Sequence, residues 1–140
     1  MAILATSAKE RGQLARNTLV ATVMSNLGLR VAMKNAGIEM IETKVGDRYV
    51  LEEIRDGGYT LGGEQSGHII FGDWATTGDG LIAGLQVLRI MKETGEPLSQ
   101  LRKCLKKFPQ CARNLRVRTK PPIEQLVEAQ KIMKETEKKL

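Results

Sequence analysis

The chain has 140 residues and a mass of 15.5 kDa, which is enough for one domain with a hydrophobic core. Hydrophobic residues make up 41% and charged residues 27%, which excludes a disordered chain, and no apolar run is long enough to cross a bilayer. The sequence has two cysteines, Cys104 and Cys111, and one histidine, which argues against a zinc site, and we expect two free thiols. The first residues also lack the layout of a secretory signal, and we expect a cytoplasmic protein with no membrane partner.

The net charge of +6 is concentrated in one stretch. Residues 102–120 hold eight basic side chains and no acidic one, whereas the rest of the chain has 14 basic and 16 acidic residues. Such a run can be a solvated surface, a nucleic-acid patch or a field that attracts a phosphorylated ligand. Phe108 is the only aromatic residue in this stretch, so it lacks the several aromatic side chains that stack on bases in single-strand binders. A solvated or domain-facing surface is therefore favoured over a nucleic-acid partner.

The first half of the chain alternates strand and helix patterns. Residues 17–24 are apolar and β-branched, as in a buried strand. Ser25 or Asn26 can cap a helix that ends near Gly37, and residues 38–43 form a second strand. A strand, a helix and a strand in this order predict an α/β fold with parallel strands.

The next elements are shorter until a long helix begins at Leu81. Residues 45–49 lead into a short helix over 49–55, and residues 72–80 form a loop without periodicity. Leu81, Leu85 and Leu88 then recur at i, i+4 and i+7 before Gly95 ends the helix. We expect this leucine stripe to face the core and to have no role in binding.

The last part of the sequence predicts a separate piece of structure. Ser99 can cap a short helix that ends before Phe108, and Leu115 and Val117 alternate with arginines as in a half-exposed strand. Pro121 and Pro122 introduce a final amphipathic helix. A lone strand and helix can bury an apolar face only against another element, so we expect residues 1–108 to form one domain and 109–140 to be the truncated start of another. The alternative is that residues 109–140 pack on the first sheet.

The stretch LGGEQSGHII, residues 61–70, has apolar ends and a polar, glycine-rich centre. This pattern predicts two short strands joined by a tight turn. Glu64 accepts hydrogen bonds, whereas Ser66 and His68 can donate or accept them, and glycine lets a ligand approach the main chain. The turn therefore either binds a polyhydroxylated ligand or is an ordinary solvated hairpin.

The GEQSGH block at residues 63–68 resembles the sugar-binding loop of the α-D-phosphohexomutase superfamily. Three further blocks, VATVMSNLGL (20–29), VGDRYVLEE (45–53) and TTGDGL (76–81), resemble its phosphoglucosamine mutase branch. The resemblance covers essentially the whole chain and implies a three-layer α/β/α domain with a mixed sheet. That domain is the third of four, followed by an incomplete strand–helix piece of the α+β fourth domain.

The resemblance also implies a site. It assigns substrate contacts to Gly63, Glu64, Ser66, Gly67 and His68 in one loop and to Asp47 and Arg48 in another. His68 could shuttle a proton, or it could be an ordinary hydrogen-bonded strand residue. An Arg48–Glu52 pair four residues apart on a helix is an equally good account of Arg48. A turn that leads into the next helix, with Asp79 near the positive end of that helix, is sufficient to explain Gly78 and Asp79.

For the parent enzyme, the resemblance implies an isomerase of amino-sugar and cell-wall precursor synthesis that transfers a phosphate through a phosphoserine and glucosamine 1,6-bisphosphate. Its partners would be a phosphohexosamine substrate and the remaining domains, and a homodimer is compatible with it. The serine loop and the loop for Mg²⁺ have no counterpart here, so we expect the chain alone to be inactive. A freestanding carbohydrate-binding module and a basic nucleic-acid-binding domain are the alternative functions.

Overall fold

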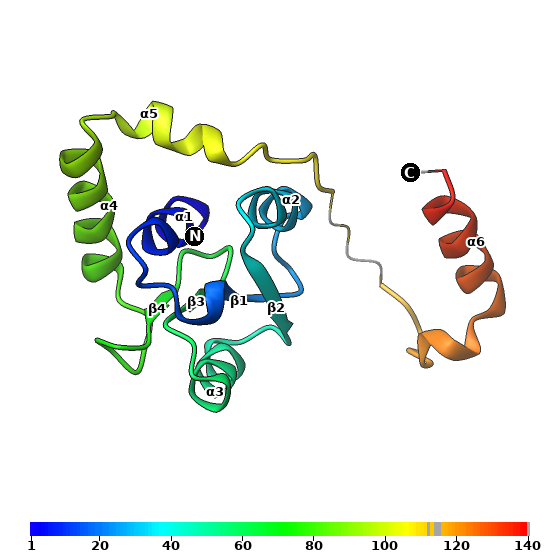
Figure 1. The fold of residues 1–140 in the computed structure, drawn as a ribbon. Coiled ribbons are helices and arrows are strands. Elements are labelled where there is room, and N and C mark those ends of the chain that lie inside the picture. The colour runs from blue at the N-terminus through cyan, green and yellow to red at the C-terminus, as the bar shows by residue number, and fades with distance from the viewer. Residues whose placement is uncertain (112, 114–115, 140) are drawn as a thin grey trace. The chain divides into compact units, whose positions relative to one another are not determined.

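The structure is a computed structural model that describes residues 1–111, 113 and 116–139 (Figure 1). These residues fall into two compact units, Met1–Gln110 and Cys111–Leu140. The predicted half-exposed strand around Val117 is wrong for residues 116–118, which have no strand conformation, and Leu115 lies outside the described residues.

The first unit is built on a four-stranded sheet with the order β2–β1–β3–β4. β1 (Thr18–Thr22) pairs in parallel with β2 (Glu39–Thr43) and with β3 (Leu61–Gly63), and β4 (Ile69–Phe71) is antiparallel to β3. The predicted mixed sheet is therefore confirmed, and the polar turn joins β3 to β4 as a hairpin.

Helices cover both faces of this sheet, which confirms the three-layer α/β/α architecture. Helices α1 (Ala2–Glu10) and α2 (Leu27–Asn35) pack on one face, and α3 (Asp47–Gly57) covers the other (Figure 1). Helix α4 (Gly80–Thr94) contacts α1 and joins the core cluster of the first face. Successive residues of β1 point to opposite faces of the sheet, so they pack alternately against the two helical layers. Leu19 and Ala21 join the core under α1 and α2, whereas Val20 packs against Val50 of α3.

Caps and glycines set the ends of the helices. The Asn26 side chain accepts a hydrogen bond from the Gly28 N–H at 3.0 Å and caps α2. The Asp79 side chain caps α4 through the N–H groups of Leu81 and Ile82. α4 ends at Gly95, whose φ of 70° is left-handed, as the sequence predicted.

Three helices differ from the sequence-based prediction. α1 was not predicted, and α3 begins at Asp47 instead of residue 49, so that Asp47 and Arg48 lie in its first turn. The short helix after α4, α5 (Leu98–Leu101), begins after Pro97 and not at Ser99, and a 3-10 turn, η2 (Arg102–Cys104), follows it. Another 3-10 turn, η1 (Ala15–Asn17), precedes β1.

The leucine stripe of α4 is not part of the core. Leu81, Leu85 and Leu88 are 74%, 54% and 60% exposed, so the prediction that they face the core is wrong. The opposite side of the helix, with Ala83, Val87 and Ile90, joins the core cluster beside α1 instead. α4 is therefore apolar on both sides, and the periodicity alone did not show which side is inside.

The second unit contains a 3-10 turn, η3 (Ile123–Gln125), and a helix, α6 (Val127–Glu137). The helix after the two prolines is thus confirmed. None of its described residues is buried, and apolar side chains such as Val127 and Met133 are 77% and 50% exposed.

Candidate functional site

The predicted site residues lie together at one edge of the sheet. The strands β1, β2 and β3 are parallel, so their carboxyl ends meet at the same edge. Glu64 follows β3 directly, and Gly46, Asp47 and Arg48 follow β2 after a short connection. In α/β proteins, ligands bind in the crevice beyond the carboxyl ends of such strands.

The turn between β3 and β4 holds its shape through main-chain hydrogen bonds. The Glu64 N–H donates to the His68 carbonyl at 3.0 Å, and the Gly67 N–H donates to the Glu64 carbonyl at 3.1 Å. Gly67 has a φ of 96°, which L side chains rarely adopt, and a Cβ on Gly63 would lie 2.6 Å from the His68 oxygen. Both glycines are therefore needed for the geometry of the turn.

The Glu64 side chain links two loops of the site. Its Oε1 accepts a hydrogen bond from the Gly46 N–H at 2.9 Å, so the loop after β3 is tied to the loop after β2. Glu64 is half-buried, and a carboxylate has several acceptor positions. One oxygen is thus held by the protein, while the carboxylate keeps acceptor capacity for a ligand.

His68 links the turn to two other segments. Its Nε2 accepts a hydrogen bond from the Gly78 N–H at 3.2 Å and lies 3.5 Å from Oδ2 of Asp47. Nε2 can accept from Gly78 only while it carries no proton, and it can donate to Asp47 only when it carries one. The ring lies so close to Gly78 that a Cβ there would overlap it. His68 therefore contacts both Asp47 and Gly78. The sequence analysis did not predict these two contacts.

Arg48 and Ser66 are exposed and are less closely tied to the site. The Arg48 Nε donates to Glu52 at 2.7 Å, four residues along α3. This hydrogen bond, together with the Glu52 charge, raises the pKa of the guanidinium above its ordinary value. The helical pair that the sequence allowed for Arg48 is thus present. Ser66 lies at the exposed tip of the turn.

Gln65 makes a contact that the sequence analysis missed. The hydroxyl of Thr22, the last residue of β1, donates to Oε1 of Gln65 at 3.3 Å. Thr22 is fully buried, whereas Gln65 is exposed, so the contact fastens the turn to the end of the central strand. The two residues are 43 positions apart, and only the strand pairing brings them together.

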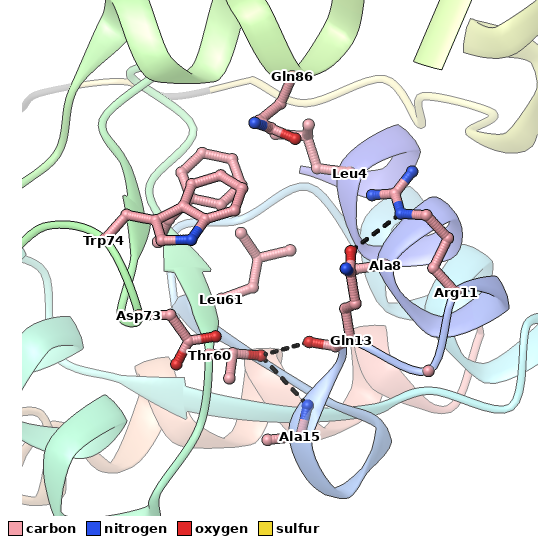
Figure 2. Close-up of a pocket in the computed structure, with 12 residues that line it drawn as sticks. Leu4, Ala8, Arg11, Gln13, Ala15, Thr60, Leu61, Asp73, Trp74 and Gln86 are labelled. Atoms are coloured by element: carbon pink, nitrogen blue, oxygen red, sulfur yellow. Dashed lines mark hydrogen bonds between the residues drawn. The ribbon is translucent and has the colours of Figure 1, made fainter. Parts of the chain in front are cut away.

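A cavity of about 360 Å³ lies away from this site. Its walls include Ala15, Leu61 and Phe71, which lie at the edge of the sheet opposite Glu64. Figure 2 shows Trp74 on one side of the cavity and Arg11 on the other. Arg11 is already bonded to Ser7, Gln13 and Glu93. The cavity has none of the predicted sugar contacts, and we place the candidate site at the carboxyl edge.

The part of the chain that the structure describes offers no metal site. No group of three or more histidine, cysteine, aspartate or glutamate side chains there could hold a metal ion. The residues present thus do not fit the Mg²⁺ that the resemblance implies for the parent enzyme. Among the same residues, no helix combines the length and the hydropathy needed to span a membrane.

The mixed sheet with helices on both faces defines an α/β/α domain, and comparisons with known proteins give its family. The family described as phosphoglucomutase/phosphomannomutase, alpha/beta/alpha domain III, matches residues 1–108. The chain therefore belongs to this family. Two similar solved structures are a putative phosphomannomutase from Thermus thermophilus, with 25% identity and a TM-score of 0.61, and a phosphoglucomutase/phosphomannomutase family protein from Burkholderia thailandensis, with 28% identity and a TM-score of 0.60. The match to the Thermus thermophilus structure covers 73% of this chain and 24% of that one, and the match to the Burkholderia thailandensis structure covers 74% of this chain and 23% of that one.

Curated relatives within the family include phosphoglucosamine mutases. The protein of Syntrophotalea carbinolica is 51% identical over 140 residues, which are 100% of this chain and 31% of the relative. The protein of Shouchella clausii is 54% identical over 137 residues, which are 98% of this chain and 31% of the relative. The chain thus spans about a third of the length of the relatives that it matches, which confirms the predicted resemblance to a part of phosphoglucosamine mutase.

Proposed function

We propose that this chain is the sugar-recognition part of a phosphoglucosamine mutase. The parent enzyme would interconvert glucosamine 6-phosphate and glucosamine 1-phosphate, through a phosphoserine and glucosamine 1,6-bisphosphate, in amino-sugar and peptidoglycan precursor synthesis. It would work in the cytoplasm, with Mg²⁺ bound by residues outside this chain. The observation that carries the proposal is the joined pair of loops at the carboxyl edge, where Glu64 is held by Gly46.

The chemistry left to this chain is orientation of the sugar. A carboxylate with one oxygen fixed by Gly46 presents its remaining acceptor positions in a defined direction. Ser66 can donate or accept beside it, and its exposure leaves it free to meet a ligand. Phosphoryl transfer depends on positioning, so a domain that aligns the sugar contributes to the rate without touching the transferred phosphate.

His68 is proposed as a contact near the sugar whose protonation state changes its partner. The neutral ring with an unprotonated Nε2 accepts from Gly78, whereas a protonated Nε2 would pair with Asp47. A proton taken up during the reaction would thus be held between two loops of the site.

The test compares the chain with the complete polypeptide that contains it. We expect the complete enzyme to convert glucosamine 6-phosphate to glucosamine 1-phosphate when a catalytic amount of the bisphosphate is present. The purified 140-residue chain should show no turnover above a contaminant control, because the transferring serine lies outside it. A complete enzyme that converts only glucose or mannose phosphates would contradict the proposed substrate, and turnover by the chain alone would contradict its proposed role.

A further inference from the structure

Helix α4 shows an apolar surface that no other element of the first unit covers. Its inner side, with Ala83, Val87 and Ile90, packs into the core of the first unit. On its outer side, Leu81, Leu85 and Leu88 form an unbroken stripe at i, i+4 and i+7, more than half exposed at each position. α4 is therefore apolar on two sides, toward the core and away from it, and Gln86, Arg89 and Glu93 lie between them.

Gly84 provides a second, independent observation on the same helix. Glycine in the interior of a helix is destabilising relative to alanine. A Cβ added to Gly84 would meet nothing within 4 Å, so no described neighbour requires the glycine. Gly84 is three residues after Leu81 and four before Leu88, and therefore adjoins both on the helix surface. Because Gly84 has no side chain, the helix surface is hollow beside the leucines, and another backbone could approach it closely.

We propose that Leu81, Leu85, Leu88 and Gly84, the outer face of α4, are a docking surface for an apolar element of the parent polypeptide outside residues 1–140. The length of the relatives supports this occupant, because the whole chain aligns with only 31% of the Syntrophotalea carbinolica protein. The inference rests on the chain being part of a longer protein, as in the proposed function, but not on the reaction that this protein catalyses.

The size of the surface favours such an occupant over a second copy of the chain. Three partly exposed leucines make an apolar patch on the order of a few hundred Å². A stable complex between separate proteins buries about 800 Å² on each partner. A segment of the same polypeptide does not lose the translational and rotational freedom that two free molecules lose, so a smaller contact is sufficient.

The Gly84→Ala substitution gives opposite expectations for the chain and for the complete polypeptide. In the 140-residue chain the added methyl meets open space and improves helix propensity, so Tm should rise by a few degrees. In the complete polypeptide the same methyl should obstruct the docked element and lower Tm. If Tm of the complete polypeptide rises or stays unchanged, or if Tm of the chain falls, the proposal is overturned.

Thiol labelling tests the same surface without relying on stability. Cys104 and Cys111 are replaced by serine, and Leu85→Cys is compared with Lys34→Cys, an exposed position on α2, by mass spectrometry of the labelled peptides. We expect Leu85→Cys to react at least tenfold more slowly in the complete polypeptide than in the chain, with Lys34→Cys alike in both. Equal rates at Leu85→Cys would overturn the proposal. Protection in the chain that grows with its concentration would assign the surface to a second copy and would also overturn it. Neither readout needs mutase activity, so failure here is distinct from failure of the proposed reaction.

Discussion

At the residue scale, the site is held together by side chains that connect loops distant in the sequence. Glu64 binds the backbone of Gly46, and His68 binds the backbone of Gly78. Each of these side chains has a structural partner and belongs to the proposed sugar-binding loop. Substitutions there should therefore change how a substrate is aligned more than whether it binds.

Glu64→Ala in the complete enzyme should lower kcat/KM in both reaction directions by similar factors. The bisphosphate intermediate must be held in two orientations, and the carboxylate would recognise both through equivalent acceptor positions. Loss of one or two charge-assisted hydrogen bonds, each about 1.5–3 kcal/mol, corresponds to roughly ten- to a few hundred-fold or more. Glu64→Gln should recover part of the activity, because its amide oxygen can still accept from Gly46. Steady-state kinetics in both directions tests this, with circular dichroism to check folding. A folded Glu64→Ala enzyme with near-normal turnover would show that the loop is an ordinary turn.

The Thr22–Gln65 hydrogen bond should position the same loop. Thr22→Val and Gln65→Ala in the complete enzyme should each lower kcat/KM several-fold, and the double variant should be no worse than the poorer single one, because both remove one interaction. Thr18→Val is the matched control, since Thr18 is equally buried at the other end of β1 and its hydroxyl donates to the Arg16 carbonyl. Additive losses in the double-mutant cycle, or an equal loss in the control, would argue against a positioning role.

At the element scale, local sequence signals predicted most helices and strands but not their surroundings. α2 could be predicted from its side-chain cap, Asn26, and α4 from the period of its leucines and from Gly95 at its end. α1 has no side-chain cap and no acidic residue in its first turn, so it gave no start signal. The period of the leucines correctly predicted the helix α4, but the prediction that they face the core was wrong. When a helix has two apolar faces, its sequence does not show which face packs against the core.

The same limit applies to the site. The glycine-rich pattern of residues 61–70 predicted the hairpin and its polar groups from local chemistry alone. The bonds from Glu64 to Gly46 and from Thr22 to Gln65 depend on strand order, and strand order is a property of the whole sheet. Contacts of this kind required the structure.

Asn26 connects the start of α2 to the segment at Phe108, and its substitution should weaken both contacts. Its Oδ1 accepts from the N–H groups of Gly28 and Phe108, and its Nδ2 donates to the Phe108 carbonyl. Asn26→Ala should lower the free energy of unfolding of the 140-residue chain by about 0.5–2 kcal/mol, the range for loss of a helix N-cap. Asn35→Ala, an exposed position at the last residue of the same helix, should cause no loss. Urea denaturation of both variants measures the difference, and equal stabilities would show that the cap and the tether contribute little.

At the scale of the whole molecule, the two units differ in how much apolar surface they bury. The first unit has two core clusters, one on each face of its sheet. In the second unit, α6 has apolar side chains but no buried residue among those described. An isolated helix of this length is marginal in water, because most helical stability in proteins comes from packing. We therefore propose that residues 109–140 are the start of a domain whose remaining elements complete its core.

Hydrogen exchange should separate the two units directly. Local opening follows burial, so the amides of residues 127–133 in α6 should exchange at least about a hundredfold faster than those of β1 and of residues 31–35 in α2. α2 is the matched reference because it is also a short helix, but its Met33 is 1% exposed. In the complete polypeptide, the α6 amides should become as slow as those of α2, because the rest of the domain would then cover Val127 and Met133. If α6 is already as protected as β1 in the 140-residue chain, its apolar face is packed within this chain, and residues 109–140 are not the start of an incomplete domain.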